Sequence, residues 1–336
     1  LSALYPIFGE RIWGWPGHII DILAIFATLF GLATSLGYGA EQASGGLNYL
    51  FELPTGDYTN IVLVAIITGL ALISVVRGLD GGIKRLSEIN MVLAVILGLF
   101  VLFMTPVMET LGYFFRYSLA YLEYLPVLSS WSGREDYYFM HDWTTFYWSW
   151  WIAFSPFVGM FIARISTGRT VREFVLGALL APSRIFMLWM TIFGHTAILQ
   201  FFEEDVTAVA ESVRNFQPEL TLFIFLEQFP GSLITSILGL FLVIIFFVTS
   251  MDSGSLVVDT MAAGGKIKTP LFQRIFWCIS LGMIGIALLL GGGLSSVQAL
   301  SLASAFPFTL IIILMTISLL LGLIREHQLL RAEQSG

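Results

Sequence analysis

Long apolar runs separated by short polar connections limit this 336-residue chain to one class of fold. A helix needs about 20 mostly apolar residues to cross a bilayer. Only 12% of the residues are charged, against about 25% in a typical soluble domain, so a water-soluble fold could not hide this much apolar surface. The sequence therefore predicts an all-α membrane protein with eight spans: Ile19–Leu36, Tyr58–Val76, Ile89–Val107, Phe146–Ala163, Phe174–Leu199, Leu233–Val248, Leu271–Leu290 and Val297–Ile324.

The connections predict how these spans are oriented. If all eight spans are real, 12 of the 16 Lys and Arg residues fall on the side of the N-terminus and three on the other side. Cytoplasmic loops are enriched in these residues, so both ends of the chain are expected to be cytoplasmic. Within the long connection 108–145, Thr110–Tyr124 has the mixed pattern of an amphipathic helix at the membrane interface. The chain begins at Leu1 without a methionine, which suggests a longer protein.

The fourth apolar run holds an unusual density of aromatic residues. One interpretation is an aromatic belt at the membrane surface, where Trp and Tyr are enriched. The other is a pocket for a cation, because indole faces attract quaternary ammonium groups by roughly 2 kcal/mol or more when desolvated. The rings come from Phe146, Tyr147, Trp148, Trp150, Trp151, Phe154 and Phe157.

The same run contains a proline, Pro156, which follows Ser155. Proline cannot donate to the carbonyl of Ile152 and clashes with the preceding turn. The freed carbonyl would have to face protein, ion or water, and many secondary transporters build binding sites from helices broken in this way. A simple proline kink is the alternative.

Two other segments carry candidate functional groups. The stretch Thr249–Ser255 is dense in hydroxyl and carbonyl oxygens, which suit sodium as they suit other hard cations. These hydroxyls could instead bond to their own helix or to a neighbouring helix, and Asp252 could cap the helix. The glycines in and after the first apolar run are interpreted as helix-packing residues.

Several function classes lack support in the sequence. The single cysteine, Cys278, excludes a disulfide framework and a cysteine metal cluster. The four histidines have no zinc-binding spacing, and no phosphate-binding glycine loop is present. An enzyme is therefore not expected, and neither is ATP-driven transport by this chain.

The run Trp143–Phe174 resembles the signature of the betaine/choline/carnitine transporter family, and Asp21–Gly37 and Thr249–Ser255 agree with it. The resemblance implies a leucine-transporter-type inverted-repeat fold of twelve spans, of which this chain would hold the fifth to twelfth. It places the last three helices of the first repeat at 1–107, an extracellular loop with an interfacial helix at 108–143, the second repeat at 144–324 and a short cytoplasmic tail at 325–336. Many members form homotrimers.

The resemblance also implies site residues. Trp151 matches the family's pocket tryptophan, with Tyr147, Trp148 and Trp150 beside it, and Phe154 stands where many members have another tryptophan. One side of the main sodium site would be formed by Phe246, Thr249 and Ser250. Thr28 and Phe157 match parts of a second sodium site, although Leu32 replaces a second threonine there.

These matches predict a secondary transporter in the bacterial inner membrane that imports glycine betaine or choline together with Na⁺ or H⁺. Sodium-independent members carry an arginine on the helix that corresponds to residues 89–107. This chain has no arginine in that range, which favours ion coupling. No other cofactor, and no nucleic-acid partner, is expected. Carnitine or dimethylsulfoniopropionate as substrate, and a sensor that binds without transporting, remain the alternatives.

Overall fold

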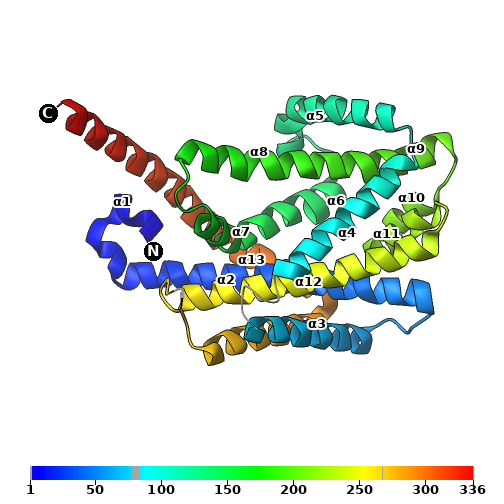
Figure 1. The fold of residues 1–336 in the computed structure, drawn as a ribbon, viewed down its shortest axis with the longest axis horizontal. Helices are drawn as coiled ribbons and strands as arrows, with labels where there is room; N and C mark the ends of the chain where they lie inside the picture. The colour runs from blue at the N-terminus through cyan, green and yellow to red at the C-terminus, as the bar shows by residue number, and fades with distance from the viewer. Residues whose placement is uncertain (1, 78–83, 267, 336) are drawn as a thin grey trace.

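The computed structural model describes residues 2–77, 84–266 and 268–335, and every regular element within these ranges is helical. The remaining residues (1, 78–83, 267 and 336), which belong to the expected first segment, second repeat and tail, lie outside the described residues. Figure 1 shows the helices α1 (Tyr5–Phe8), α2 (Trp15–Phe51), α3 (Asp57–Arg77), α4 (Lys84–Phe103), α5 (Val107–Ser129), α6 (Tyr137–Phe139), α7 (Phe146–Ile165), α8 (Val171–Met190), α9 (Thr196–Glu203), α10 (Ala208–Arg214), α11 (Pro218–Glu227), α12 (Ser232–Ala262) and α13 (Leu271–Ser335). Short 3-10 turns, η1 (Ser2–Leu4) and η2 (Gly9–Trp13), flank α1, and π-helical turns, η4 (Met140–Thr145) and η5 (Thr191–His195), precede α7 and α9.

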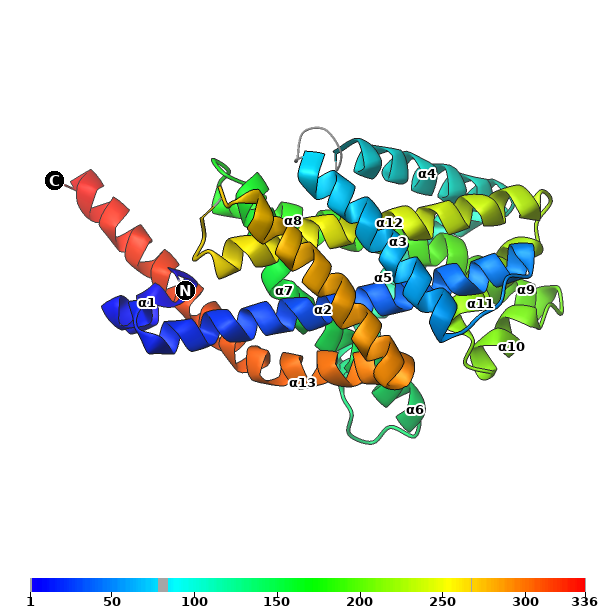
Figure 2. The ribbon, with the colours of Figure 1, turned by 90° about the horizontal axis from the view of Figure 1, so that it is seen from below.

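Seven helices in the described ranges are long and apolar enough to cross a membrane. The last of them, α13, contains two helical segments, because Gly292 (φ 157°) and Gly293 (φ 64°) leave helical geometry. Positive φ is cheap for glycine and costly for other residues. The chain turns at this point, and Figure 2 shows the first segment crossing α2 and the second running beside it. The break separates the predicted seventh and eighth spans, and the predicted all-α membrane fold is confirmed.

Two of the spanning helices are longer than their apolar runs. α2 has 37 residues and rises about 55 Å, well beyond the roughly 30 Å of bilayer hydrocarbon. α12 has 31 residues and ends at Ala262. Asp252 therefore lies inside α12, is only 2% exposed and does not cap the helix, so that alternative was wrong. Both chain termini lie at the same end of the molecule (Figure 1).

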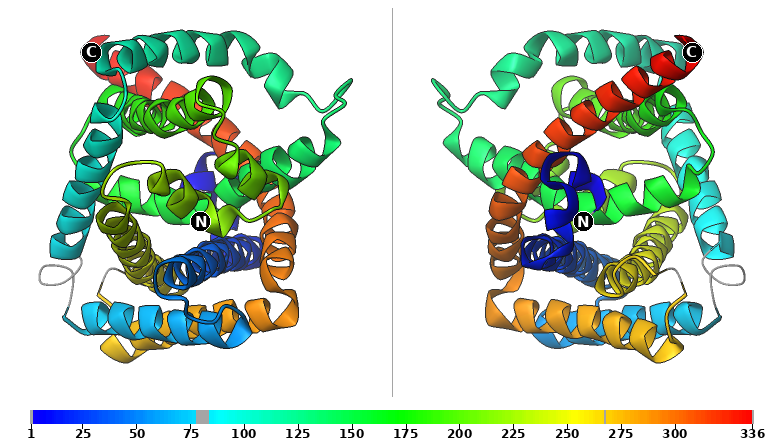
Figure 3. Two further views of the ribbon diagram at one scale, coloured as in Figure 1. Left: turned by 90° about the vertical axis from the view of Figure 1, so that its right-hand side faces the viewer. Right: turned by 90° about the vertical axis from the view of Figure 1, so that its left-hand side faces the viewer.

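α2 is the central helix of the structure. It packs against α3, α7, α11, α12 and α13, and the end-on views of Figure 3 show it between α12 and α13. The packing is close enough to require glycine at Gly39, where a Cβ atom would lie 2.1 Å from the ring of Phe247 on α12. The interpretation of these glycines as packing residues is confirmed.

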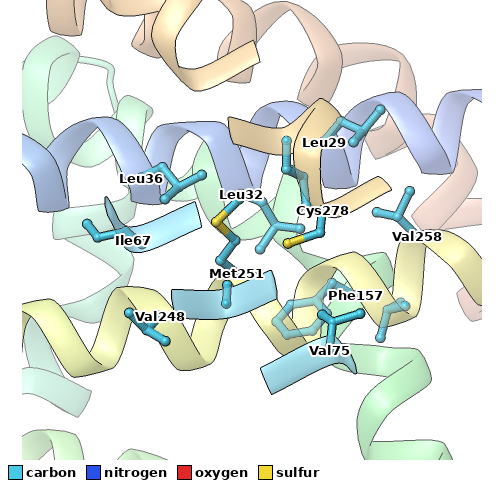
Figure 4. Packing of buried hydrophobic residues seen from close by; sticks show 13 residues of the cluster. Leu29, Leu32, Leu36, Ile67, Val75, Phe157, Val248, Met251, Val258 and Cys278 are labelled. Carbon is cyan, nitrogen blue, oxygen red and sulfur yellow. The ribbon is translucent and has the colours of Figure 1, made fainter. Parts of the chain in front are cut away.

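The largest apolar cluster lies where α2, α3, α7, α12 and α13 meet. Figure 4 shows Leu32 of α2, Val75 of α3, Phe157 of α7, Met251 of α12 and Cys278 of α13 converging from these five helices. The single cysteine is thus a buried core residue. This cluster fixes the helices that carry most of the predicted site residues.

The periphery is apolar as well. α8 buries none of its residues within the described structure, and Ile185 and Met190 are 65% and 70% exposed. Such a helix suits lipid rather than water as its solvent. α5, in the connection where an amphipathic helix was predicted, lies outside α8 (Figure 1) and is held by a hydrogen bond between the Tyr117 hydroxyl and Nδ1 of His195, 2.8 Å long.

We expect Gly39→Ala to destabilise the helix bundle. The added methyl group must displace the Phe247 ring, and overpacking of this kind costs roughly 1–3 kcal/mol. Thermal unfolding of the purified protein in detergent should show a lower midpoint temperature.

The matched control is Gly69→Ala in α3, where a Cβ atom would meet nothing within 4 Å. This variant should unfold at the wild-type temperature or slightly above it, since both changes give the same gain in helix propensity. Equal midpoints for the two variants would contradict the close packing of α2 on α12.

Candidate functional site

The aromatic run forms the first three turns of α7, and one of its tryptophans faces α2. Nε1 of Trp150 donates a hydrogen bond to the carbonyl oxygen of Gly31, 3.1 Å long. The indole ring stacks on Tyr38 of α2, at 5.6 Å and 18°, and on Phe146, at 5.5 Å and 25°, and the rings of Tyr38 and Phe146 lie 5.7 Å from each other. These three rings, which we call the aromatic stack, join α7 to α2.

Gly31 makes this contact possible. A Cβ atom at residue 31 would lie 3.2 Å from the backbone carbon of Ala153 and 3.2 Å from the backbone nitrogen of Phe154. A larger residue would push α7 away from α2. The glycine therefore sets the distance at which the Trp150 indole reaches the α2 backbone.

The other predicted substrate residues point in different directions. Tyr147 contacts the edge of the stack, with its ring 5.6 Å from that of Trp150. Trp151 turns toward α8 and meets Phe186 at 6.2 Å, while Trp148 is 58% exposed. Consecutive helical positions lie 100° apart, so neighbouring tryptophans cannot share one wall.

Phe154 lies deeper along α7 and packs edge-on against Phe157 at 4.9 Å. Phe157 belongs to the apolar cluster of Figure 4 and is 8% exposed. Of the five predicted substrate residues, the structure thus brings Trp150 and Tyr147 together and places Phe154 below them. Trp148 and Trp151 lie on other faces of α7.

The predicted helix break at Pro156 is absent. α7 continues as a helix from Phe146 to Ile165. The carbonyl of Ile152, which Pro156 deprives of its backbone donor, accepts a hydrogen bond of 2.7 Å from Oγ of Ser155. The hydroxyl of the residue before the proline thus replaces the missing backbone donor, and the Ile152 carbonyl needs no partner from outside the helix.

The three main sodium-site candidates lie on α12, within the helix rather than after it. The Thr249 hydroxyl donates to the carbonyls of Ile245 and Phe246, 3.0 Å from each. Its oxygen lone pairs remain available to a cation. Ser250 is half-buried and the Phe246 side chain is 47% exposed, so this group faces the surface of the described structure.

Thr28, the candidate for the second sodium site, has a different environment. It is fully buried on α2, and its hydroxyl oxygen has no hydrogen-bond partner among the described residues. Burying a hydroxyl without a partner costs roughly 1–3 kcal/mol. Thr28 lies on α2, which packs against α7, the helix that carries Phe157. Its hydroxyl oxygen lacks a partner and is therefore a candidate cation ligand.

Several residues at the stack were not predicted. Tyr38 forms one side of it and accepts a hydrogen bond from the Gln298 side chain of α13. The Thr34 hydroxyl donates to the carbonyl of Val297, 3.3 Å away. The segment Gly37-Tyr38-Gly39 could have indicated a close helix contact, because it places small residues beside an aromatic ring. The sequence does not show which helix makes that contact.

Comparison with known proteins accounts for this arrangement. A model of the betaine/carnitine/choline family of transporters matches residues 1–328. The chain belongs to this family. Its members are transporters, so the prediction that the chain is not an enzyme is confirmed, and the inverted-repeat fold follows from family membership.

This chain is 54% identical over 328 residues to a glycine betaine/proline/choline transporter of Vibrio parahaemolyticus. The match covers 98% of this chain and 59% of the relative. A glycine betaine/proline/choline/ectoine transporter of the same organism is 47% identical, covering 97% and 58%. A glycine betaine transporter of Bacillus subtilis is 39% identical, covering 97% and 64%. The chain spans less than two-thirds of each relative's length. These bacterial relatives and the seven apolar helices make it part of a multi-pass bacterial membrane protein.

We expect Trp150→Phe to loosen the contact between α7 and α2. Phenylalanine keeps a ring in the stack but loses the donor to the Gly31 carbonyl, a hydrogen bond whose net contribution is about 0.5–1.5 kcal/mol. The midpoint of thermal unfolding should fall.

Trp148→Phe provides the comparison for this stability measurement. The Trp148 side chain makes no ring contact and no hydrogen bond within the described residues, so its replacement should leave the midpoint unchanged. A midpoint that falls equally in both variants would show that the Trp150–Gly31 bond adds no stability.

Proposed function

We propose that this chain is part of a secondary active transporter that imports a quaternary-ammonium compatible solute, glycine betaine or choline, by cation-coupled symport. The observation that carries the proposal is the aromatic stack of Tyr38, Phe146 and Trp150 at the contact of α2 and α7. Ring faces attract methylated cations without a salt bridge. Two of the relatives are transporters of glycine betaine and choline among other solutes, and both of these compounds carry a trimethylammonium group.

The indole of Trp150 suits a methylated cation for a specific reason. Its N–H is already bonded to the Gly31 carbonyl, so the donor is not free for a substrate carboxylate. Its ring is half-buried, and a substrate would meet the part of the ring face that Tyr38 and Phe146 leave uncovered. In the proposed site the ammonium group would meet ring faces from Trp150 and Tyr147, with Phe154 below.

The coupling cation, which is a transported substrate, would bind hydroxyl oxygens. Thr249 and Ser250 of α12, with the Phe246 carbonyl, would form one side of the main site. The orphaned hydroxyl of Thr28 supports a second site near Phe157. Sodium is the first choice because these are uncharged oxygen ligands, and a proton is the alternative.

The proposal includes orientation. The bias of Lys and Arg toward one side supports cytoplasmic termini in the bacterial inner membrane, with 37–57, 108–145 and 200–232 outside. Accumulation of such a solute would serve osmoprotection. Within this scheme α7, α8, α12 and α13 up to residue 324 belong to the second repeat at 144–324.

The decisive experiment is uptake of radiolabelled choline and glycine betaine by the full-length protein in proteoliposomes, with and without a sodium gradient. Concentrative uptake that depends on sodium is the expected result. Binding without flux would indicate the sensor alternative. Absence of uptake of choline, glycine betaine, carnitine and dimethylsulfoniopropionate would refute the proposal.

Thr249→Ala should raise the sodium concentration for half-maximal uptake by about fivefold or more, since a ligand oxygen is lost. Thr260→Ala is the matched control. Thr260 lies on the same helix, and its hydroxyl also donates to its own helix, to the Leu256 carbonyl at 2.9 Å, so both variants lose an intrahelical bond. If both shift the sodium dependence equally, Thr249 is not a ligand.

A further inference from the structure

A carboxyl group is buried within the apolar part of α12. Asp252 is 2% exposed, and the residue before it, Met251, belongs to the apolar cluster of Figure 4. No ion pair among the described residues involves Asp252, and its Oδ2 atom has no hydrogen-bond partner there. An unpaired carboxylate is far more costly to bury than a neutral polar group. Ionisable residues inside membrane helices mark ion pathways, so we expect Asp252 to bind a positively charged partner.

A hydroxyl group of α3 lies beside this carboxyl group. The Ser74 side chain is close to Asp252 but is not placed to hydrogen-bond to it, and its oxygen has no partner among the described residues. Hydroxyls in helices commonly bond back to their own backbone, as Thr68 of the same helix does to the Val64 carbonyl at 2.7 Å. Two oxygens that each lack a partner thus lie together at the contact of α3 and α12.

The chemistry of this pair favours a metal cation. Carboxylate and hydroxyl oxygens are hard ligands, which suit Na⁺ as they suit other hard cations. A cation between Asp252 and Ser74 would neutralise the carboxylate and give both oxygens a partner. Two protein ligands are few for a hard cation, so water would fill its other positions and binding would be weak. Such a site suits a cation that passes through rather than one that is held.

Asp252 is part of a stripe of oxygen-bearing residues along α12. Thr249 precedes it by three positions, and Ser255 and Asp259 follow it by three and seven, spacings that place side chains on one side of a helix. Ser255 and Asp259 are fully buried. From Thr249 to Asp259 the helix rises about 15 Å. In the proposed orientation Asp259 lies at the cytoplasmic end, so the stripe leads from the main sodium-site candidates toward the cytoplasm.

The far end of the stripe is closed in this structure. Nε of Arg274, on α13, lies 3.8 Å from Oδ2 of Asp259, and the Thr269 hydroxyl donates a hydrogen bond to the same oxygen. Oδ1 of Asp259 has no partner among the described residues. The stripe therefore ends at a second carboxylate, which joins α12 to α13.

We propose that Asp252 and Ser74 form a further cation site, which receives the coupling Na⁺ from Thr249 and Ser250 and passes it toward the cytoplasmic end of α12. The inference rests on the proposed function, because it assumes sodium-coupled uptake and the proposed orientation. The site lies one helical turn beyond Thr249 and offers the charge that the uncharged main site lacks. It governs how fast sodium leaves on the inner side, and not how external sodium binds.

The test compares two modes of glycine betaine transport by the full-length transporter in proteoliposomes. Net uptake, driven by an inward sodium gradient, requires sodium release on the inner side in every cycle. Exchange of internal for external glycine betaine, with saturating sodium on both sides, does not. Asp252→Asn keeps the side-chain shape and removes the charge. We expect it to slow net uptake about fivefold or more, because the barrier to sodium release rises, and to change exchange less than about twofold.

Ser74→Ala and Ser236→Ala are a matched pair that also serves if Asp252→Asn fails to fold. Both serines are buried and have hydroxyl oxygens without a partner among the described residues, but Ser236 lies near the start of α12, away from the stripe. Ser74→Ala should slow net uptake and spare exchange, whereas Ser236→Ala should leave both modes unchanged. Equal effects of the two serine variants would overturn the inference.

Two other results would also overturn it. One is that Asp252→Asn changes net uptake and exchange to the same extent. The other is that Asp252→Asn removes a response to a proton gradient and leaves the sodium-driven rate intact, since the carboxyl group would then bind a proton. In these cases the wild type still takes up glycine betaine with sodium, so the proposed function stands. A wild-type protein without sodium-driven uptake would instead refute the proposed function, and the inference with it.

Discussion

The close approach of α2 to its neighbours is the constraint on which the rest of the structure depends. In lipid, apolar side chains gain little by meeting one another, so helices associate through tight packing and a few interhelical hydrogen bonds. Glycines at 31 and 39 bring α7 and α12 within reach of the α2 backbone. At that distance Trp150 can bond to a main-chain carbonyl and Phe247 can lie across the helix. Without this packing, the rings and hydroxyls of the proposed sites would have no fixed positions relative to one another.

Hydropathy predicted the spans because the bilayer imposes one length on all of them, but it could not predict where the helices end. The apolar run of α2 stops near Leu36, and the helix continues to Phe51. Residues such as Tyr38 and Glu41 are too polar to extend an apolar run, yet nothing in them ends a helix. By contrast, the glycines at 292 and 293 separate two helical segments that run in different directions, and the gap between the predicted seventh and eighth spans fell at this point.

The site was only partly readable from the sequence for a similar reason. Periodicity shows which aromatic residues share a face of α7, but not which face meets α2. Trp150 and Trp151 are equivalent as sequence, and the structure separates them completely, one toward Gly31 and the other toward Phe186. The contact between Tyr38 and Gln298 joins residues 260 positions apart. Pro156 illustrates the opposite error, because the rule for proline was correct, whereas the compensation by Ser155 depended on a side-chain rotamer.

The Gly31 carbonyl also limits how α2 and α7 can move. It accepts hydrogen bonds from the Trp150 indole at 3.1 Å and from the Ser35 hydroxyl at 3.4 Å, in addition to its place in the α2 backbone. Sliding α7 along α2 would break the indole bond and unstack Trp150 from Tyr38 together. In a medium without water no other donor would replace the one that is lost. The two helices are therefore expected to move as one unit, and a conformational change that opens the proposed site to either side would have to occur at their other interfaces.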